Sequence, residues 1–131
     1  MTTERDMTAE RVPEQDFRVW SLGGLPVVTP PPEVDVGNAE RFGAALAAAG
    51  RDHATLVVDM TATEFCDSSG LSALAAALGR AQAAGGELRL VVGSSAVRKV
   101  LAVTGMDSVC AMYDRLPEAI AARVPKPASG S

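Results

Sequence analysis

The feature that most constrains the fold of this chain is a strand pattern that runs into a helix pattern across a polar corner. The apolar run at residues 56–58 predicts a buried strand, and the helical period that starts at Leu71 predicts a helix. Leu71 is followed at helical spacing by Leu74, Ala75 and Leu78. We therefore expect these side chains to form one buried face of that helix.

The corner itself has the sequence Asp67-Ser68-Ser69-Gly70. Asp67 and Ser68 can each accept a hydrogen bond from the free backbone N–H groups of a helix's first turn. The same N–H groups and the positive end of the helix dipole favour a negative charge nearby. A phosphate on Ser68 would add about −1.5 to −2 charges there without breaking the fold. The corner therefore has two interpretations, a plain helix cap or a phosphorylation switch.

Strand and helix patterns alternate along the chain, and this order predicts the fold class. The expected strands are residues 17–22, 26–29, 56–59, 87–92 and 109–113. The expected helices are residues 36–49, a segment from 71 that ends at Gly85-Gly86, a segment from Ser94 or Ser95 to Gly105, and a short one near Pro117. Such alternation implies parallel pairing through crossovers. We predict one α/β domain at 16–123, with a mixed sheet of four or five strands and helices mainly on one face.

Turn and cap residues support this order. Gly23-Gly24 supply the positive φ values of a tight hairpin turn, so the first strand is expected to be antiparallel to the second. Three prolines at 30–32 end the second strand, because proline has no N–H for the ladder. Asp35 is expected to cap the first helix, and Gly50 to close it.

Composition excludes several classes of partner. The formal net charge is −4 and no basic tract is present, which argues against a nucleic-acid-binding surface. The polar start predicts no secretory signal, and the absence of a long apolar run predicts no membrane span. We expect a cytoplasmic protein. Residues 1–15 are expected to be a disordered leader and residues 124–131 a disordered tail.

The reactive side chains are few. Cys66 and Cys110 are the only cysteines, and in a cytoplasmic protein we expect both thiols to be reduced and buried. With one histidine besides, the chain offers no ligand set for a metal, and we expect neither a metal nor a cofactor. Cys66 is interpreted as a core residue rather than a redox sensor, because the neighbouring charge of Asp67 disfavours its thiolate.

An enzyme is not expected. A serine hydrolase needs a base next to its nucleophile, and His53 is the only histidine. His53 precedes the central strand whereas Ser68 follows it, so six strand residues should separate them by about 20 Å. Asp67 is interpreted as a helix cap rather than a general base.

Four segments together resemble one protein family. The stretch Phe65-Cys66-Asp67-Ser68-Ser69-Gly70-Leu71 resembles the signature of STAS domains, specifically that of bacterial anti-sigma factor antagonists. Residues 32–39 are similar to the segment that opens the first helix of those domains. Residues 85–90 and 97–105 are similar to the family's next strand and helix. The likeness covers roughly residues 16 to 122 and implies the STAS fold.

The resemblance also implies a function in transcription regulation, such as a stress response or sporulation. It implies partner switching, in which the unphosphorylated form binds an anti-sigma factor serine kinase and so releases a sigma factor. The kinase phosphorylates Ser68, which ends binding, and a Ser/Thr phosphatase restores it. The partner-binding residues that it implies are Asp35, Asn38, Asp67, Ser68, Ser69, Gly70 and Leu71.

The sequence allows alternative interpretations of the loop, of Gly70 and of the function. Residues 32–35 read Pro-Glu-Val-Asp where relatives have a Gly-Glu-Leu-Asp type of sequence, which stiffens the loop and changes its contacts. Gly70 either permits close approach of a partner backbone or eases the corner. The alternative function is a STAS scaffold or small-ligand sensor in which Ser68 is never phosphorylated. An alanine-rich helix can also serve as the face of a weak homodimer.

Overall fold

The computed structural model of the chain describes residues 17–123. The segments expected to be a disordered leader and tail, residues 1–15 and 124–131, lie outside the described residues. Within the described range, strands and helices alternate in the order that the sequence predicts, and one additional short strand pair appears.

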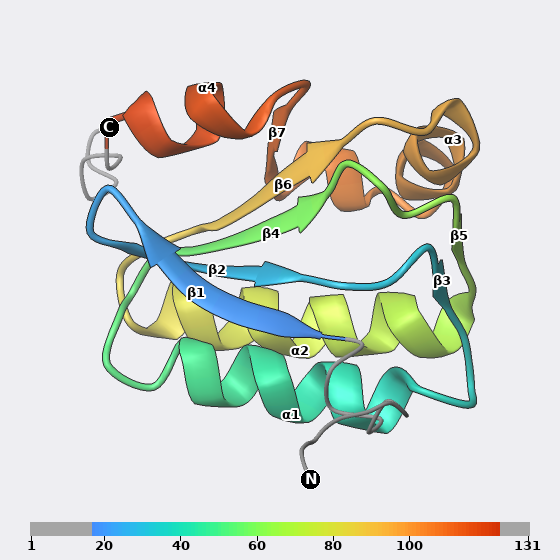
Figure 1. Cartoon of the computed structure of the whole chain (residues 1–131), viewed down its shortest axis with the longest axis horizontal. Coiled ribbons are helices and arrows are strands. Elements are labelled where there is room, and N and C mark those ends of the chain that lie inside the picture. The colour runs from blue at the N-terminus through green and yellow to red at the C-terminus, as the bar shows by residue number, and fades with distance from the viewer. Residues whose placement is uncertain (1–16, 124–131) are drawn as a thin grey trace, which may run out of the picture.

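A five-stranded mixed sheet forms the centre of the molecule (Figure 1). Its strands, in spatial order, are β1 (Arg18–Leu22), β2 (Leu25–Thr29), β4 (Leu56–Met60), β6 (Leu88–Val92) and β7 (Ala111–Tyr113). β1 and β2 form the predicted antiparallel hairpin, with Gly23 and Gly24 at positive φ in its turn. The other neighbours pair in parallel. The predicted mixed α/β sheet is confirmed.

The helices cover the two faces unequally. α1 (Ala39–Ala49) and α2 (Ser68–Ala83) lie side by side along one face (Figure 1). α3 (Ser95–Val103) and the short 3₁₀ helix η2 (Met106–Ser108) add side chains to the same core. The short α4 (Leu116–Ala121) packs on the opposite face. The prediction that helices pack mainly on one face is confirmed.

Two cores follow from the alternation of side chains along the central strand. Val58 faces the larger core under α1 and α2, together with Phe42 and Leu74. Its neighbour Val57 faces the smaller core, which is formed by Val27, Val57, Val91 and Ala119. A strand that is buried on both faces reads as a continuous apolar run, as residues 56–58 do.

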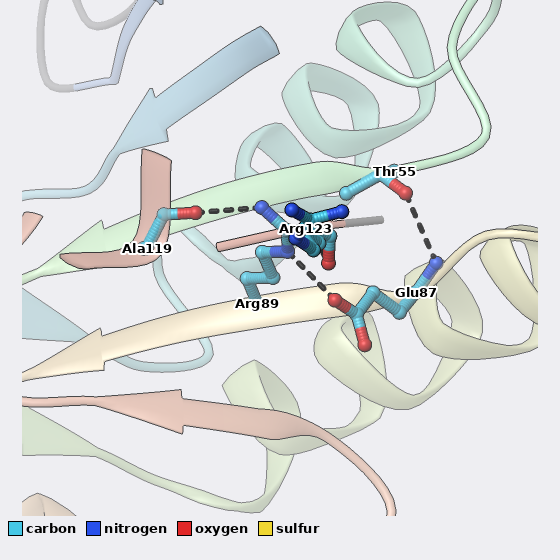
Figure 2. Close-up of polar contacts among 5 residues, drawn as sticks. All are labelled: Thr55, Glu87, Arg89, Ala119 and Arg123. Atoms are coloured by element: carbon cyan, nitrogen blue, oxygen red, sulfur yellow. Dashed lines mark hydrogen bonds and ion pairs between the residues drawn. The ribbon is translucent and has the colours of Figure 1, made fainter. Parts of the chain in front are cut away.

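A buried arginine joins α4 to the sheet, and the sequence gives no sign of it. Arg89 on β6 is fully buried, and its Nε donates to Glu87 at 2.7 Å. Its two terminal nitrogens donate to the carbonyl oxygens of Ala119 at 2.6 Å and Arg123 at 3.0 Å (Figure 2). The guanidinium therefore holds α4 and the residues that directly follow it against the sheet, since its planar fork can reach several acceptors at once.

The first helix begins later than predicted. α1 starts at Ala39 rather than 36, and Asn38 rather than Asp35 is the residue before it. The Asp35 side chain instead accepts from Gly37 N, and the Asp35 carbonyl accepts from the backbone N–H groups of Asn38 and Ala39. This local turn competes with helical hydrogen bonding, as short polar side chains commonly do. Gly50 closes the helix as predicted.

The second helix begins earlier than predicted, at Ser68 rather than Leu71. Its buried residues are Gly70, Leu74, Ala77, Leu78 and Ala81. The expectation that Ala75 is buried is wrong, because Ala75 is exposed. One residue step turns a helix by about 100°, so Ala75 points well away from the stripe centred on Leu74.

Candidate functional site

The corner at the start of α2 is held by one aspartate. The Asp67 carboxylate accepts hydrogen bonds from the backbone N–H groups of Ser69 at 2.9 Å and Gly70 at 3.2 Å. The predicted cap role of Asp67 is confirmed. Ser68 is the first residue of the helix instead of a second capping residue. One carboxylate therefore satisfies two of the donors that a helix start leaves without an intrahelical partner.

Ser68 is exposed, whereas its neighbours on both sides are partly or fully covered. Asp67 and Ser69 are half-buried, and Gly70 is buried. Ser68 is therefore the residue of the corner that is most open to a second protein. Cys66 lies on the inner side, and burial followed by the charge of Asp67 raises the pKa of its thiol to about 11. The interpretation of Cys66 as a buried core thiol is confirmed.

A small second sheet brings the predicted loop to this corner. β3 (Glu33–Val34) pairs in parallel with β5 (Phe65–Cys66), with Val34 opposite Cys66. The backbone N–H of Asp67 then donates to the carbonyl of Val34 at 3.1 Å. Because the two strands run in the same direction, the chain after Val34 and the chain after Cys66 leave from the same end. The Asp35–Asn38 loop and the Ser68 corner are thus neighbours.

The loop is shaped by the two residues that the resemblance singled out. The Asn38 side chain accepts from Asp35 N at 2.9 Å and donates to the carbonyl of Glu33 at 2.9 Å. Asp35 and Asn38 are both half-buried, so they fix the loop more than they project from it. Val36 stands at the loop's tip with 80% of its surface exposed. No motif or pattern in the sequence marks Val36.

Gly70 faces the interior. A Cβ at this position would lie 2.7 Å from Cys66 Sγ and 2.8 Å from Val34 Cγ1. The close approach that Gly70 permits is therefore between α2 and the β3–β5 pair within the molecule. Leu71, the next residue, is half-buried and packs against the larger core.

An apolar hollow lies beside the corner. Phe65 is 50% exposed, although phenylalanine is usually buried. It helps to line a hollow of about 60 Å³ between β5 and α3, to which Val97 and Val100 contribute. In the sequence Phe65 stands out only as the first residue of the Phe65–Leu71 motif, and its exposure has no sequence signature.

The structure separates the histidine from the serine. His53 lines a small hollow with Arg80 and Ala81, which lie near the C-terminal end of α2. Ser68 lies at the other end of that helix, about 18 Å away along the axis at 1.5 Å per residue. Across residues 17–123, no three His, Cys, Asp or Glu side chains are grouped so that they could hold a metal ion. In the same range, no helix has the length and apolar character needed to cross a bilayer.

Comparison with known proteins identifies this arrangement. The family model of the STAS domain matches residues 18–119. A solved anti-sigma factor antagonist from Mycobacterium paratuberculosis is 30% identical, with a TM-score of 0.69, over 79% of this chain and 89% of that chain. A putative anti-sigma factor antagonist from Thermotoga maritima is 22% identical, with a TM-score of 0.70, over 82% and 94%.

A third solved structure is the Bacillus cell fate determinant SpoIIAA in its phosphorylated form. It is 22% identical, with a TM-score of 0.63, over 79% of this chain and 96% of that chain. At this identity the likeness to the Thermotoga and Bacillus structures concerns the fold. No curated protein sequence matches the chain significantly.

Proposed function

Because the chain belongs to the STAS domain family, we propose that it is an anti-sigma factor antagonist whose binding is switched by phosphorylation of Ser68. In this proposal the unphosphorylated protein binds an anti-sigma factor serine kinase in the cytoplasm, and a sigma factor is released. The 30% identity to the mycobacterial antagonist supports the role. The observation that carries the proposal is the exposure of Ser68 at a helix start whose neighbours are held in place.

The binding surface in this proposal comprises Val36, Phe65 and Ser68, which we call the switch surface. Val36 and Phe65 expose large apolar side chains, and the β3–β5 pairing joins the two segments that carry them. Exposed apolar side chains that cluster beside a functional residue are typical of protein contact sites. A phosphate on Ser68 would place about −1.5 to −2 charges in that surface. Covering such a charge without a partner cation is costly, so the complex with the anti-sigma factor would weaken.

The chain acts as the substrate of this chemistry. The Ser68 hydroxyl oxygen attacks the γ-phosphorus of ATP, the bond to the β–γ bridging oxygen breaks, and ADP leaves. The hydroxyl proton passes to a base of the kinase. A Ser/Thr phosphatase hydrolyses the phosphate ester, which restores the Ser68 hydroxyl and releases inorganic phosphate. The kinase and the phosphatase supply the catalytic groups.

The phosphate acceptor is tested by mass spectrometry of the full chain after incubation with the host's anti-sigma kinase and ATP. We expect one phosphate on Ser68, and none after Ser68→Ala. Ser69→Ala is the matched control, because it removes the adjacent hydroxyl and should leave phosphorylation intact. Phosphate on Ser69, or on neither serine, would refute the assignment.

The electrostatic part of the switch is tested with a pair of variants of equal size. Ser68→Glu places a charge on the switch surface, whereas Ser68→Gln adds the same bulk without charge. We expect the Glu variant to bind the anti-sigma factor more weakly than the Gln variant in a titration. Equal affinities would show that bulk rather than charge ends binding.

A further inference from the structure

A groove of about 320 Å³ lies between β1 and α1, and the switch surface does not include it. Its lining residues are Phe17, Val19, Arg41, Ala44 and Ala45. It is several times larger than the hollow of about 60 Å³ beside Phe65.

One wall of the groove is the open edge of the sheet. Among residues 17–123, β1 is the first strand in the sheet order and pairs only with β2 (Figure 1). Val19 on this strand is 51% exposed and lines the groove. An edge strand with an exposed apolar side chain is a template for pairing with another segment of chain. Native proteins commonly cover such an edge.

The other wall is the first half of α1. Phe17, which also lines the groove, stacks on Phe42 of this helix with ring centroids 5.5 Å apart. Arg41 lines the groove from α1 and donates to the carbonyl of Gly37 at 3.4 Å. The groove therefore presents apolar walls, a strand edge and a cation. A short apolar segment that carries acidic residues fits this combination.

We propose that this groove binds residues 1–16 of the same chain, with Val12 and Met7 as the apolar contacts. These residues directly precede Phe17, which is itself part of the groove. A segment of this length spans at most about 55 Å when extended, whereas the five residues of β1 span about 17 Å. The segment can therefore run along the whole edge.

Tethering and charge both favour this occupant over a separate molecule. A short flexible tether gives an effective concentration on the order of millimolar, so weak contacts suffice. The segment carries five acidic side chains, Glu4, Asp6, Glu10, Glu14 and Asp16, against the two arginines Arg5 and Arg11. Its net negative charge complements Arg41 in the groove. Pro13 can begin a turn ahead of Asp16 that sends the segment back beside β1.

Binding of this segment gives it a role that a plain disordered leader lacks. It covers the apolar edge of β1 and so keeps two copies of the chain from pairing edge to edge. It also lies against the helix that follows the Asp35–Asn38 loop. The inference does not depend on phosphorylation of Ser68, because it concerns a different part of the surface.

Paramagnetic relaxation enhancement in the full ¹⁵N-labelled chain tests the proposal. Thr8→Cys carries a nitroxide label, and the native thiols of Cys66 and Cys110 are buried and react poorly. We expect the amide signals of Ala44 and Ala45 to lose most of their intensity. The signal of Ala119, on the opposite face of the sheet, should keep its intensity.

A matched pair of variants tests the groove itself in the labelled chain. Ala44→Glu puts a carboxylate into the groove against the acidic segment, whereas Ala48→Glu puts one on the same helix outside it. We expect Ala44→Glu to restore most of the lost intensity at Ala45, and Ala48→Glu to leave the loss in place.

Two results would overturn the proposal. One is a full-intensity Ala45 amide signal in the nitroxide-labelled chain, which would show that residues 1–16 do not occupy the groove. The other is broadening of the Ala45 signal in a mixture of two kinds of chain, one enriched in ¹⁵N without a nitroxide and the other carrying the nitroxide without ¹⁵N. That result would assign the groove to a second copy.

Discussion

Gly70 should be the residue at which the fold and the switch surface are most tightly linked, and Gly70→Ala tests this. The added Cβ would lie 2.7 Å from Cys66 Sγ and 2.8 Å from Val34 Cγ1. Both neighbours are almost fully buried, so neither is the free end of a flexible side chain. The β3–β5 pair must therefore move away from α2.

The magnitude follows from two opposing terms. Alanine is a better helix former than glycine by up to about 1 kcal/mol. Overpacking a buried contact costs about 1–3 kcal/mol. We expect Gly70→Ala to lower the free energy of unfolding by about 1 kcal/mol. Gly79→Ala in the same helix should raise it by about 1 kcal/mol, because nothing lies within 4 Å of a Cβ at that position.

Urea denaturation of the two variants beside the wild type measures the difference. Their free energies of unfolding should change in opposite directions at unchanged m-value. The same displacement should slow phosphorylation of Ser68 in the Gly70→Ala variant, while Gly79→Ala is phosphorylated normally. If Gly70→Ala proves as stabilising as Gly79→Ala, the contact between α2 and the β3–β5 pair does not constrain the corner.

Three further predictions concern stability. Asp67→Ala should lower the free energy of unfolding by about 1 kcal/mol in urea denaturation, because both cap hydrogen bonds are lost; Asp67→Asn should recover most of it. Arg89→Leu should lower it by about 3 kcal/mol, and Arg89→Lys should recover only part, because one ammonium cannot reach the same three acceptors. Burial raises the pKa of the Cys66 and Cys110 thiols from 9.0 to about 11, so the folded state holds these protons longer than the unfolded state. The free energy of unfolding should therefore fall as the pH rises from about 9 to about 11, because the unfolded state releases the two thiol protons first; the variant with both Cys66→Ala and Cys110→Ala should show a flatter pH profile.

Long, strongly patterned elements could be predicted from the sequence because their signals are local. Each of these signals lies within a short stretch of sequence: a strand is predicted by the apolar run at 56–58, a helix by the period after Leu71, and a hairpin turn by the glycine pair at 23–24. The order of these signals was enough for the fold class. The starts of α1 and α2 differ from the predicted ones by about three residues. The position of a helix start depends on which nearby side chain forms hydrogen bonds with the free backbone N–H groups, and the sequence pattern does not show this.

The parts that could not be predicted depend on contacts between distant segments. β3 and β5 are two residues long, so neither shows a periodicity, and their pairing appears only when the chain has folded. Arg89 reads as an exposed strand residue because arginine is rarely buried without partners. Two of its three partners are backbone carbonyls about thirty residues further along the chain, which carry no sequence signature.

The geometry of the helix start suggests how a phosphate on Ser68 would act. The backbone N–H groups of Ser69 and Gly70 already donate to Asp67, so they are not available to a phosphate while that cap remains. A phosphate would therefore gain little from the helix start and would be repelled by the adjacent carboxylate. It would point into solvent, where its charge would affect contact with the anti-sigma factor and not the packing of the core. In our proposal the switch therefore changes the binding surface and leaves the packing under α2 as it is.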